Sequence, residues 1–339
     1  MIKKFKFIVF SLAAIFSMFF LLPCSGYDGQ QLDVSVLILP HFEIGELSGD
    51  FPGEVQYFYE EYFMDGDSYE INGGYTLYYN KADKIAMCVT GSGKTNASAA
   101  LTAVLCDGRF CFESSRILAV GCAGGAIEYS TLGDVCIATA VYDFDLGHTA
   151  DPRDLTGDGS KWFHDSTYDD VCHKELNAEL AEELYKQVKD MSLETTEISK
   201  KILAQNFDNA EWAARDPKVI LGSCITSDNY WKGIYDHNKA NEICEYYNSK
   251  YPFAMSEMED AAIAEVADKF GMLDRLVVLR VSVNTDVFMN GDTPETLWSE
   301  NLSFDETVTE ENKETLDIFQ PAMRNLFKVG KEIINILTR

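Results

Sequence analysis

The sequence predicts an α/β fold with a central mixed, mostly parallel sheet flanked by helices. Short apolar runs alternate with helical stretches along the chain, as in proteins whose strands are joined by helices. Several of these runs end at glycine or proline, which is typical of strands that leave a sheet. No internal repeat, low-complexity tract or linker-like stretch divides the 339 residues. One domain is therefore the economical interpretation.

The predicted strands are apolar runs bounded by turn signals, which suits strands buried on both faces of a sheet. The run 85–89 is central because it leads through Gly91 and Gly93 into a helix of small residues. The run 73–79 is aromatic and reads as an edge strand. The other predicted strands are 34–39, 116–120, 135–141, 219–222 and 276–283.

Five helices follow from apolar positions that recur on one face. The clearest spans 174–191, where Leu176, Leu180 and Leu184 recur every four residues. Another is expected to begin at Ser256, with Ser256 and Glu259 forming a capping box. The remaining predicted helices are 53–63, 94–105 and a closing helix from 321 to 337.

The N-terminus reads as a secretion signal. Lysines at positions 3, 4 and 6 precede an apolar run at 7–22, which is short for a spanning helix of about 20 residues. We therefore expect a signal peptide at 1–26 and a domain at 27–339. Cys24 is an alternative lipidation site, and an uncleaved anchor is a further alternative. The expected location is the periplasm, with the chain free or lipid-anchored at Cys24.

Composition excludes several classes of function. The formal net charge of −27 argues against nucleic acid or an anionic membrane surface as a partner. No CxxC or HxxxH spacing indicates a metal site. The string around Gly91 is not a phosphate-binding P-loop, because that motif needs glycine where Cys88 stands.

Two glycine-rich strand ends are the first candidates for a site. A strand that turns on Gly91, Ser92 and Gly93 into a helix directs backbone N–H groups at whatever lies above the sheet, commonly an anion or a sugar-phosphate. The second follows the strand at 116–120, at residues 121–125. Two such loops can face each other across a site, although glycines also serve plain turns.

Acidic and aromatic side chains also stand near predicted strand ends. Glu43 and Glu46 follow the first strand, where α/β folds bind ligands, although solvated loops carry such acids as well. Tyr230 and Trp231 are placed to stack on a flat ring, or are simply buried. For Glu259 the structural alternative is the helix cap.

Several ordered motifs together resemble the nucleoside phosphorylase superfamily, and more closely the purine nucleoside permease family. The resemblance runs from about 33 to 335 and implies a nucleoside phosphorylase-like fold. The superfamily motifs are TGSGKTNAS at 90–98, GCAGG at 121–125, TSDNYW at 226–231, SEMEDAAIAEV at 256–266 and RVSVNTD at 280–286. The stretches at 42–58 and 140–155 resemble the permease family in particular.

The resemblance implies roles for particular residues. Glu259 matches the carboxylate that holds the ribose 2′- and 3′-hydroxyls, and both hydroxyls can donate to one carboxylate. Met258 matches the residue against the sugar, with Glu257 beside it, and Tyr230 the aromatic that stacks on the base. Glu43 falls roughly where nucleosidases keep the acid that activates water. The walls of the phosphate or water pocket match Gly91, Ser92, Gly93, Cys122, Ala123 and Gly124.

Two departures from the superfamily pattern bear on chemistry. Asn284 stands where nucleosidases place an aspartate that protonates the purine N7, and an amide cannot deliver a proton. Asp286, two residues on, would supply the acid if the strand extends that far. Ala119 stands where bacterial-type phosphorylases place a phosphate-binding arginine, with Lys94 the nearest other cation.

We therefore expect an exported protein that recognises purine nucleosides and binds them for uptake or scavenging. The alternative is an enzyme that cleaves the N-glycosidic bond, as a nucleosidase or, less in keeping with Ala119, a phosphorylase. No cofactor is expected, and phosphate is the one co-substrate left open. The resemblance also leaves open a membrane transport partner and a homo-oligomer.

Overall fold

The computed structural model describes residues 29–147, 166–289 and 313–339. The expected signal peptide at 1–26 lies outside these residues, as does part of the 140–155 motif. Across the described ranges, no helix has the length and apolar character needed to cross a bilayer.

Within the described residues, ten strands form one mixed sheet and two more form a small separate pair. In the large sheet β2 pairs in parallel with both β5 and β7, and β12 pairs in parallel with β7. The hairpin of β3 and β4 adds antiparallel strands at one edge. The strands are β1 Leu32–Asp33, β2 Val36–Leu39, β3 Asp67–Ile71, β4 Tyr75–Asn80, β5 Ile85–Cys88, β6 Phe110–Cys111, β7 Arg116–Gly125, β8 Val135–Asp143, β9 His173–Glu175, β10 Val219–Thr226, β11 Phe253–Glu257 and β12 Leu276–Thr285.

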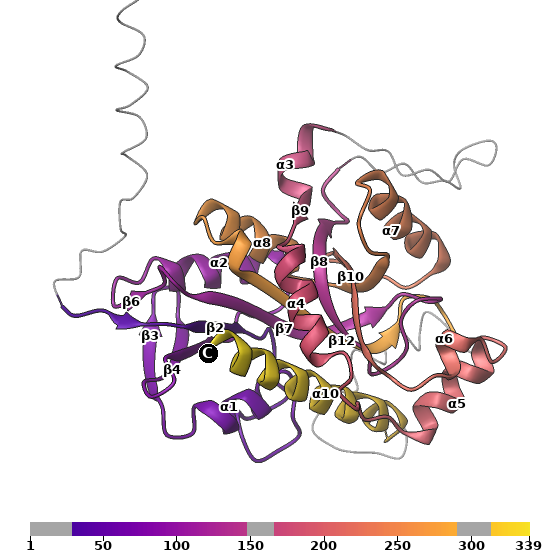
Figure 1. Ribbon diagram of the computed structural model, residues 1–339, viewed down its shortest axis with the longest axis horizontal. Coiled ribbons are helices and arrows are strands. Elements are labelled where there is room, and N and C mark those ends of the chain that lie inside the picture. The colour runs from indigo at the N-terminus through magenta and orange to yellow at the C-terminus, as the bar shows by residue number, and fades with distance from the viewer. Residues whose placement is uncertain (1–28, 148–165, 290–312) are drawn as a thin grey trace, which may run out of the picture.

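Helices cover both faces of this sheet (Figure 1). The first core cluster contains buried residues of α2 and α8, which pack side by side. The second cluster contains buried residues of α1, α4 and α10. The helices are α1 Gln56–Tyr62, α2 Lys94–Leu105, α3 Asp169–Cys172, α4 Ala178–Val188, α5 Glu197–Asn206, α6 Glu211–Ala214, α7 Ile234–Tyr246, α8 Asp260–Lys269 and α10 Lys313–Leu337.

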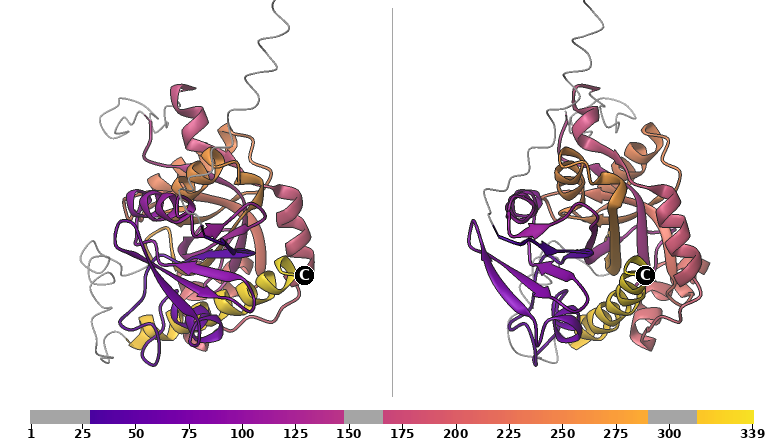
Figure 2. Two further views of the ribbon diagram at one scale, coloured as in Figure 1. Left: turned by 90° about the vertical axis from the view of Figure 1, so that its left-hand side faces the viewer. Right: turned by 60° about the vertical axis from the view of Figure 1, so that its left-hand side comes forward.

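Five strands close into a ring of pairings, which brings their ends together. The order β11–β10–β8–β12–β7 is closed by an antiparallel contact between β11 and β7, with Ser256 opposite Gly124. A Cβ at Gly124 would lie 2.7 Å from Ser256 Oγ and 3.0 Å from Asn284 Oδ1, so only glycine allows this approach. Figure 2 shows the β3–β4 hairpin on the other side of the molecule from α7.

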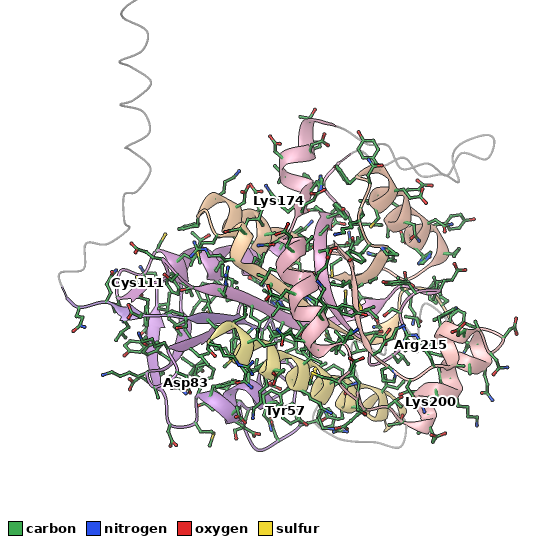
Figure 3. All side chains as sticks on the ribbon, viewed as in Figure 1. Tyr57, Asp83, Cys111, Lys174, Lys200 and Arg215 are labelled. Atoms are coloured by element: carbon green, nitrogen blue, oxygen red, sulfur yellow. The ribbon has the colours of Figure 1, made fainter. Side chains whose placement is uncertain are left out.

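Ion pairs fasten peripheral elements to this frame. Lys174 of β9 pairs with Glu265 at 2.9 Å and Asp268 at 2.7 Å on α8 (Figure 3). Arg215, after α6, donates to buried Asp134 at 2.7 Å just before β8. These contacts hold β9 against α8 and the end of α6 against the start of β8.

The fold class and the predicted strands are confirmed, and α2 has the predicted bounds. Two predicted helices begin later than expected, because residues 173–175 and 253–257 are strands β9 and β11. The glycine-rich segment 121–125 is not a loop but the end of β7. The closing helix begins earlier, at Lys313, with Pro321 inside it.

The predicted capping box at Ser256 and Glu259 is wrong. Glu257 accepts the backbone N–H groups of Glu259 at 2.6 Å and Asp260 at 2.7 Å, and therefore caps α8 itself. Ser256 lies in β11 and donates instead to the carbonyl of Gly124. The Ser-x-x-Glu spacing matches a capping box, but Ser256 is part of strand β11 and pairs with β7.

Candidate nucleoside site

A cleft opens where β7, β11 and β12 end, beside the loop that follows β10. It is the edge of the sheet at which α/β folds commonly bind ligands. The cleft is lined by Gly124, Asn229, Tyr230, Trp231, Ser256, Glu257, Met258, Asn284, Thr285 and Asp286. Four distant parts of the chain therefore contribute to one concave surface.

Aromatic and amide groups form one side of this cleft. The Asn284 side-chain amide donates to the hydroxyl of Tyr230, so the two are in direct contact. Tyr230 is 40% exposed, which leaves ring surface for a ligand. Trp231 instead stacks on Phe144, with ring centroids 5.1 Å apart. Of the two aromatics, Tyr230 is the more exposed.

Asp286 lines the cleft, but its carboxylate is directed into the protein. The side chain is fully buried, with Oδ2 2.6 Å from His237 Nδ1 and Oδ1 accepting the Ile127 N–H at 3.1 Å. The strand ends at Thr285 and its register shifts between Ser282 and Asn284, so simple alternation does not carry through to Asp286. The carboxylate is placed to hold neighbouring backbone and His237.

Glu259 adjoins the cleft through its neighbour Met258. Its Oε1 accepts the backbone N–H of Gly93 at 2.8 Å, and its Oε2 accepts from Arg280 Nη2 at 3.1 Å. Residues 91–93 therefore meet the C-terminal part of β11 through one carboxylate. Gly91 and Gly93 have φ of 82° and 89°, a conformation that favours glycine.

Arg280 of β12 is the buried cation of this site. Its Nη2 donates to Asp260 at 2.7 Å and to Glu257 and Glu259 at 3.1 Å each. These carboxylates raise the pKa of Arg280 well above its usual value. Arg280 belongs to the motif at 280–286 but was not assigned a role, because a cation was sought at position 119. It stands on β12, opposite Gly121 of the neighbouring strand β7, and spacing in the sequence does not reveal this pairing.

Glu54 is a second buried residue of this site that was not assigned a role from the sequence. Its Oε1 accepts the N–H of Cys122 and its Oε2 the N–H of His41, both at 2.8 Å. Burial raises the pKa of Glu54 to about 7, although Arg280 opposes the shift. Glu54 lies two residues before α1, in the 42–58 stretch that resembles the permease family. This position is the feature of the sequence that could have identified it as a site residue.

His41 links Arg280 to the glycine turn. Its Nε2 accepts from Arg280 Nη2 at 3.0 Å, so Nδ1 carries the proton and donates to Thr90 Oγ1 at 2.8 Å. Thr90 in turn donates to the carbonyl of Gly91. Burial and the Arg280 charge keep the pKa of His41 well below its ordinary value, so the ring is neutral. We call His41, Glu54, Glu257, Glu259, Asp260 and Arg280 the Arg280 cluster.

Glu43 lies outside the cleft lining. Its carboxylate accepts four backbone N–H groups, including those of Val55 at 2.9 Å and Gln56 at 2.6 Å at the start of α1. Burial raises its pKa while these hydrogen bonds oppose the shift. The geometry therefore gives Glu43 a local role in folding the 43–56 loop, and Glu54 occupies the inner position.

Lys94 and the glycine turn are committed to protein carboxylates. Lys94 Nζ lies 2.9 Å from Asp143 Oδ1 and from Asp145 Oδ2, and its backbone N–H donates to Asp228 at 2.8 Å. With Gly93 bound to Glu259, the N–H groups at this helix start already face negative side chains. The arrangement offers little to an additional anion.

The structure thus brings most of the predicted residues together. Tyr230, Asn284, Met258, Glu257 and Gly124 line one cleft, and Glu259 adjoins it. Cys122 and Ala123 lie in β7 just before Gly124, and burial raises the pKa of the Cys122 thiol well above its usual value. Ser92 belongs to the turn that Glu259 holds. Among the described residues, no group of histidine, cysteine and acidic side chains is arranged to hold a metal ion.

Solved structures that resemble this fold include two nucleosidases. An S-adenosylhomocysteine nucleosidase from Streptococcus pyogenes, in complex with 5-methylthiotubericidin, aligns over 91% of this chain and 99% of its own, with a TM-score of 0.52 and 15% identity. A 5′-methylthioadenosine/S-adenosylhomocysteine nucleosidase from Colwellia psychrerythraea, in complex with adenine, aligns over 88% and 96%, with a TM-score of 0.51 and 20% identity. At these identities the likeness defines the class of fold.

Sequence comparison is more specific. The family described as purine nucleoside permease (NUP) matches residues 33–339, and the chain belongs to this family. A probable purine nucleoside permease of Schizosaccharomyces pombe is 24% identical over 234 residues, which cover 62% of this chain and 67% of the relative. The purine nucleoside permease of Candida albicans is 25% identical over 217 residues, 58% of this chain and 53% of the relative. The chain thus matches only about half the length of the Candida protein.

Proposed function

We propose that this chain is an exported protein that binds purine nucleosides for uptake or scavenging. The observation that carries the proposal is the cleft itself, in which Tyr230, Asn284 and Met258 stand together and Glu259 adjoins them. An aromatic face suits a purine ring, and an amide can donate to or accept from its edge. Membership of the purine nucleoside permease family supports the same substrate class.

Glu259 is proposed to hold the ribose. Each of its oxygens accepts one strong hydrogen bond, from Gly93 and from Arg280. A carboxylate has about four acceptor sites, so two remain for the vicinal hydroxyls of a ribose. The Gly93 and Arg280 contacts fix the carboxylate beside Met258 and so orient those sites.

The charges favour a neutral ligand over phosphate. Arg280 already faces three carboxylates within 3.1 Å, and Lys94 faces two within 2.9 Å. Neither cation has uncompensated charge to offer a dianion. We therefore propose binding without phosphate, with uptake completed by a separate membrane protein.

Nucleoside hydrolysis is the second candidate, and Glu54 is the observation that favours it. A buried carboxyl whose pKa is raised to about 7 can take a proton from water near neutral pH. The part of the cleft that would face the purine base is less suited to hydrolysis, because Asn284 has no proton to give and the Asp286 carboxylate is directed away from the cleft. Weak leaving-group assistance is the physical reason that binding ranks first.

One experiment separates these functions. Purified protein is incubated with inosine, adenosine and guanosine, with and without phosphate, while base release is followed by chromatography and binding by calorimetry. Saturable binding without base release is the expected result. Release without phosphate would establish the nucleosidase, and release only with phosphate would contradict the charge argument. Absence of both binding and release would overturn the proposal.

A further inference from the structure

Asp286 uses all of its polar atoms to join separate parts of the cleft. Its backbone N–H donates to Gly125 at 3.1 Å, and its carbonyl accepts the Gly233 N–H at 2.8 Å. Its carboxylate accepts the Ile127 N–H at 3.1 Å and lies 2.6 Å from His237 Nδ1. This carboxylate is therefore fully buried and has a hydrogen-bond partner on each oxygen.

The partners of Asp286 belong to three walls of the cleft. Gly125 follows Gly124 at the end of β7, and Ile127 comes directly after this strand. Gly233 closes the loop that carries Tyr230 and precedes α7. Asp286 itself stands two residues after Asn284. Asp286 therefore links, through its backbone and its side chain, the parts of the chain that carry Tyr230, Asn284 and Gly124.

Asn241 determines which ring nitrogen of His237 carries the proton. The Asn241 amide nitrogen donates to the His237 backbone carbonyl at 3.1 Å, which identifies it as nitrogen rather than oxygen. The same nitrogen lies 2.9 Å from His237 Nε2, so Nε2 is the acceptor. The proton of the neutral ring is then on Nδ1, from which it is donated to Asp286.

We infer that His237 and Asn241 are positioning residues for the nucleoside cleft, acting through Asp286. Every hydrogen bond in the series runs one way, from Asn241 to His237 to Asp286. The polarity makes Asp286 an acceptor that fastens the base-binding walls, not a source of protons for the base. This inference rests on the proposed function, because its effect is on nucleoside binding.

Reversing the polarity tests the inference. In Asp286→Asn, the new NH₂ group faces one of two other donors, the Ile127 N–H or the His237 Nδ1–H. If the His237 ring takes the opposite tautomer, its Nε2–H points at the Asn241 amide nitrogen, which is also a donor. Such an unsatisfied buried donor corresponds to a loss of at least about fivefold in the affinity for nucleoside. We expect the inosine affinity of Asp286→Asn to fall by that factor or more in calorimetry.

The double variant supplies the rescue. Asn241→Asp provides an acceptor for Nε2–H, although it loses the hydrogen bond that Asn241 donates to the His237 carbonyl. Asp286→Asn with Asn241→Asp can therefore reverse the two hydrogen bonds of the ring and regain affinity to within about threefold of wild type. Asn335→Asp, on the exposed side of α10, controls for the added charge. Equal affinity of Asp286→Asn and wild type, or no recovery in a folded double variant, would overturn the inference.

A spectroscopic measurement keeps the inference testable even if Asp286→Asn does not fold. Nitrogen-15 NMR of histidine-labelled wild-type protein distinguishes the two tautomers, and comparison with His237→Gln assigns the signal. We expect the His237 proton on Nδ1, with Nε2 as the acceptor of the Asn241 amide. Protonation at Nε2 alone, or at both nitrogens, would contradict the series. A wild type that binds no purine nucleoside would instead contradict the proposed function, whatever the tautomer.

Discussion

Two buried clusters at the same edge of the sheet differ in how they neutralise charge. In the Arg280 cluster one guanidinium faces three carboxylates at 2.7 to 3.1 Å, with Glu54 nearby. In the second cluster, Asp286, His237 and Asn241, one carboxylate faces neutral donors. The first therefore holds negative charge that its cation only partly balances, while the second is a directed series of hydrogen bonds. Neither presents a spare cation, which suits a neutral ligand rich in hydroxyl donors.

The largest effect is expected from removing the cation of the Arg280 cluster. Arg280→Met leaves buried carboxylates without their partner, and such a loss costs about 3–5 kcal/mol of unfolding free energy. Urea unfolding at neutral pH measures it. Arg324→Met is the matched control, since the Arg324–Glu194 pair is partly exposed and should contribute less than about 1 kcal/mol. Equal costs for both variants would contradict the role of Arg280 as the partner of buried carboxylates.

Glu54 should make stability depend on pH. Because its pKa is raised to about 7 in the folded protein, the folded state holds the proton more tightly than the unfolded state. Its contribution is complete below the unfolded pKa near 4.5 and is lost as the pH rises through 7, up to about 3 kcal/mol.

The pH dependence of Glu54→Gln isolates this contribution. Between roughly pH 5 and pH 8, the free energy of unfolding should fall less in this variant than in wild type. Glu113→Gln, at an exposed position, should retain the wild-type dependence. A wild-type slope in Glu54→Gln would show that the Glu54 pKa is not raised.

Glu259→Gln tests the contribution of the Arg280 cluster to nucleoside binding. The amide presents a donor where the ribose hydroxyls need an acceptor, so nucleoside affinity should weaken by about 1–3 kcal/mol. Calorimetry with inosine measures this, with Glu113→Gln again as control. Unchanged affinity would count against the ribose assignment.

The smallest effect is expected at Tyr230. Tyr230→Ala removes one ring face and should weaken nucleoside binding by about 0.5–1.5 kcal/mol with little change in stability, since the side chain is 40% exposed. Tyr235, 63% exposed and outside the cleft lining, provides the control Tyr235→Ala. A similar loss in both variants would mean that the base does not stack on Tyr230.

Strands were the part of the fold that the sequence predicted best. Runs such as 85–88 and 276–285 are apolar throughout and end at turn residues, so burial on both faces is visible locally. Strands β9 and β11 were read as helix starts, because a three-residue or five-residue strand next to a helix has no period of its own. Their strand character comes from pairing with β8, β10 and β7.

The site was predictable as a place but not as a set of contacts. Tyr230, Met258 and Asn284 were expected near one another because strand ends of a parallel sheet meet at one edge. Arg280, His237 and Glu54 were not assigned, because each has partners that are distant in the chain. Arg280 and His41 are 239 residues apart, Glu54 and Cys122 are 68 apart, and His237 and Asp286 are 49 apart. Glu43 and Glu54 are both acids before α1, and only the folded loop shows which one reaches the interior.

A structure of the protein with a bound purine nucleoside would test the central claim most directly. We expect the base to lie against Tyr230 and Asn284, the ribose hydroxyls to bind Glu259, and the Asp286–His237 contact to stay intact. A nucleoside bound at any other place on the molecule, with this cleft empty, would contradict it.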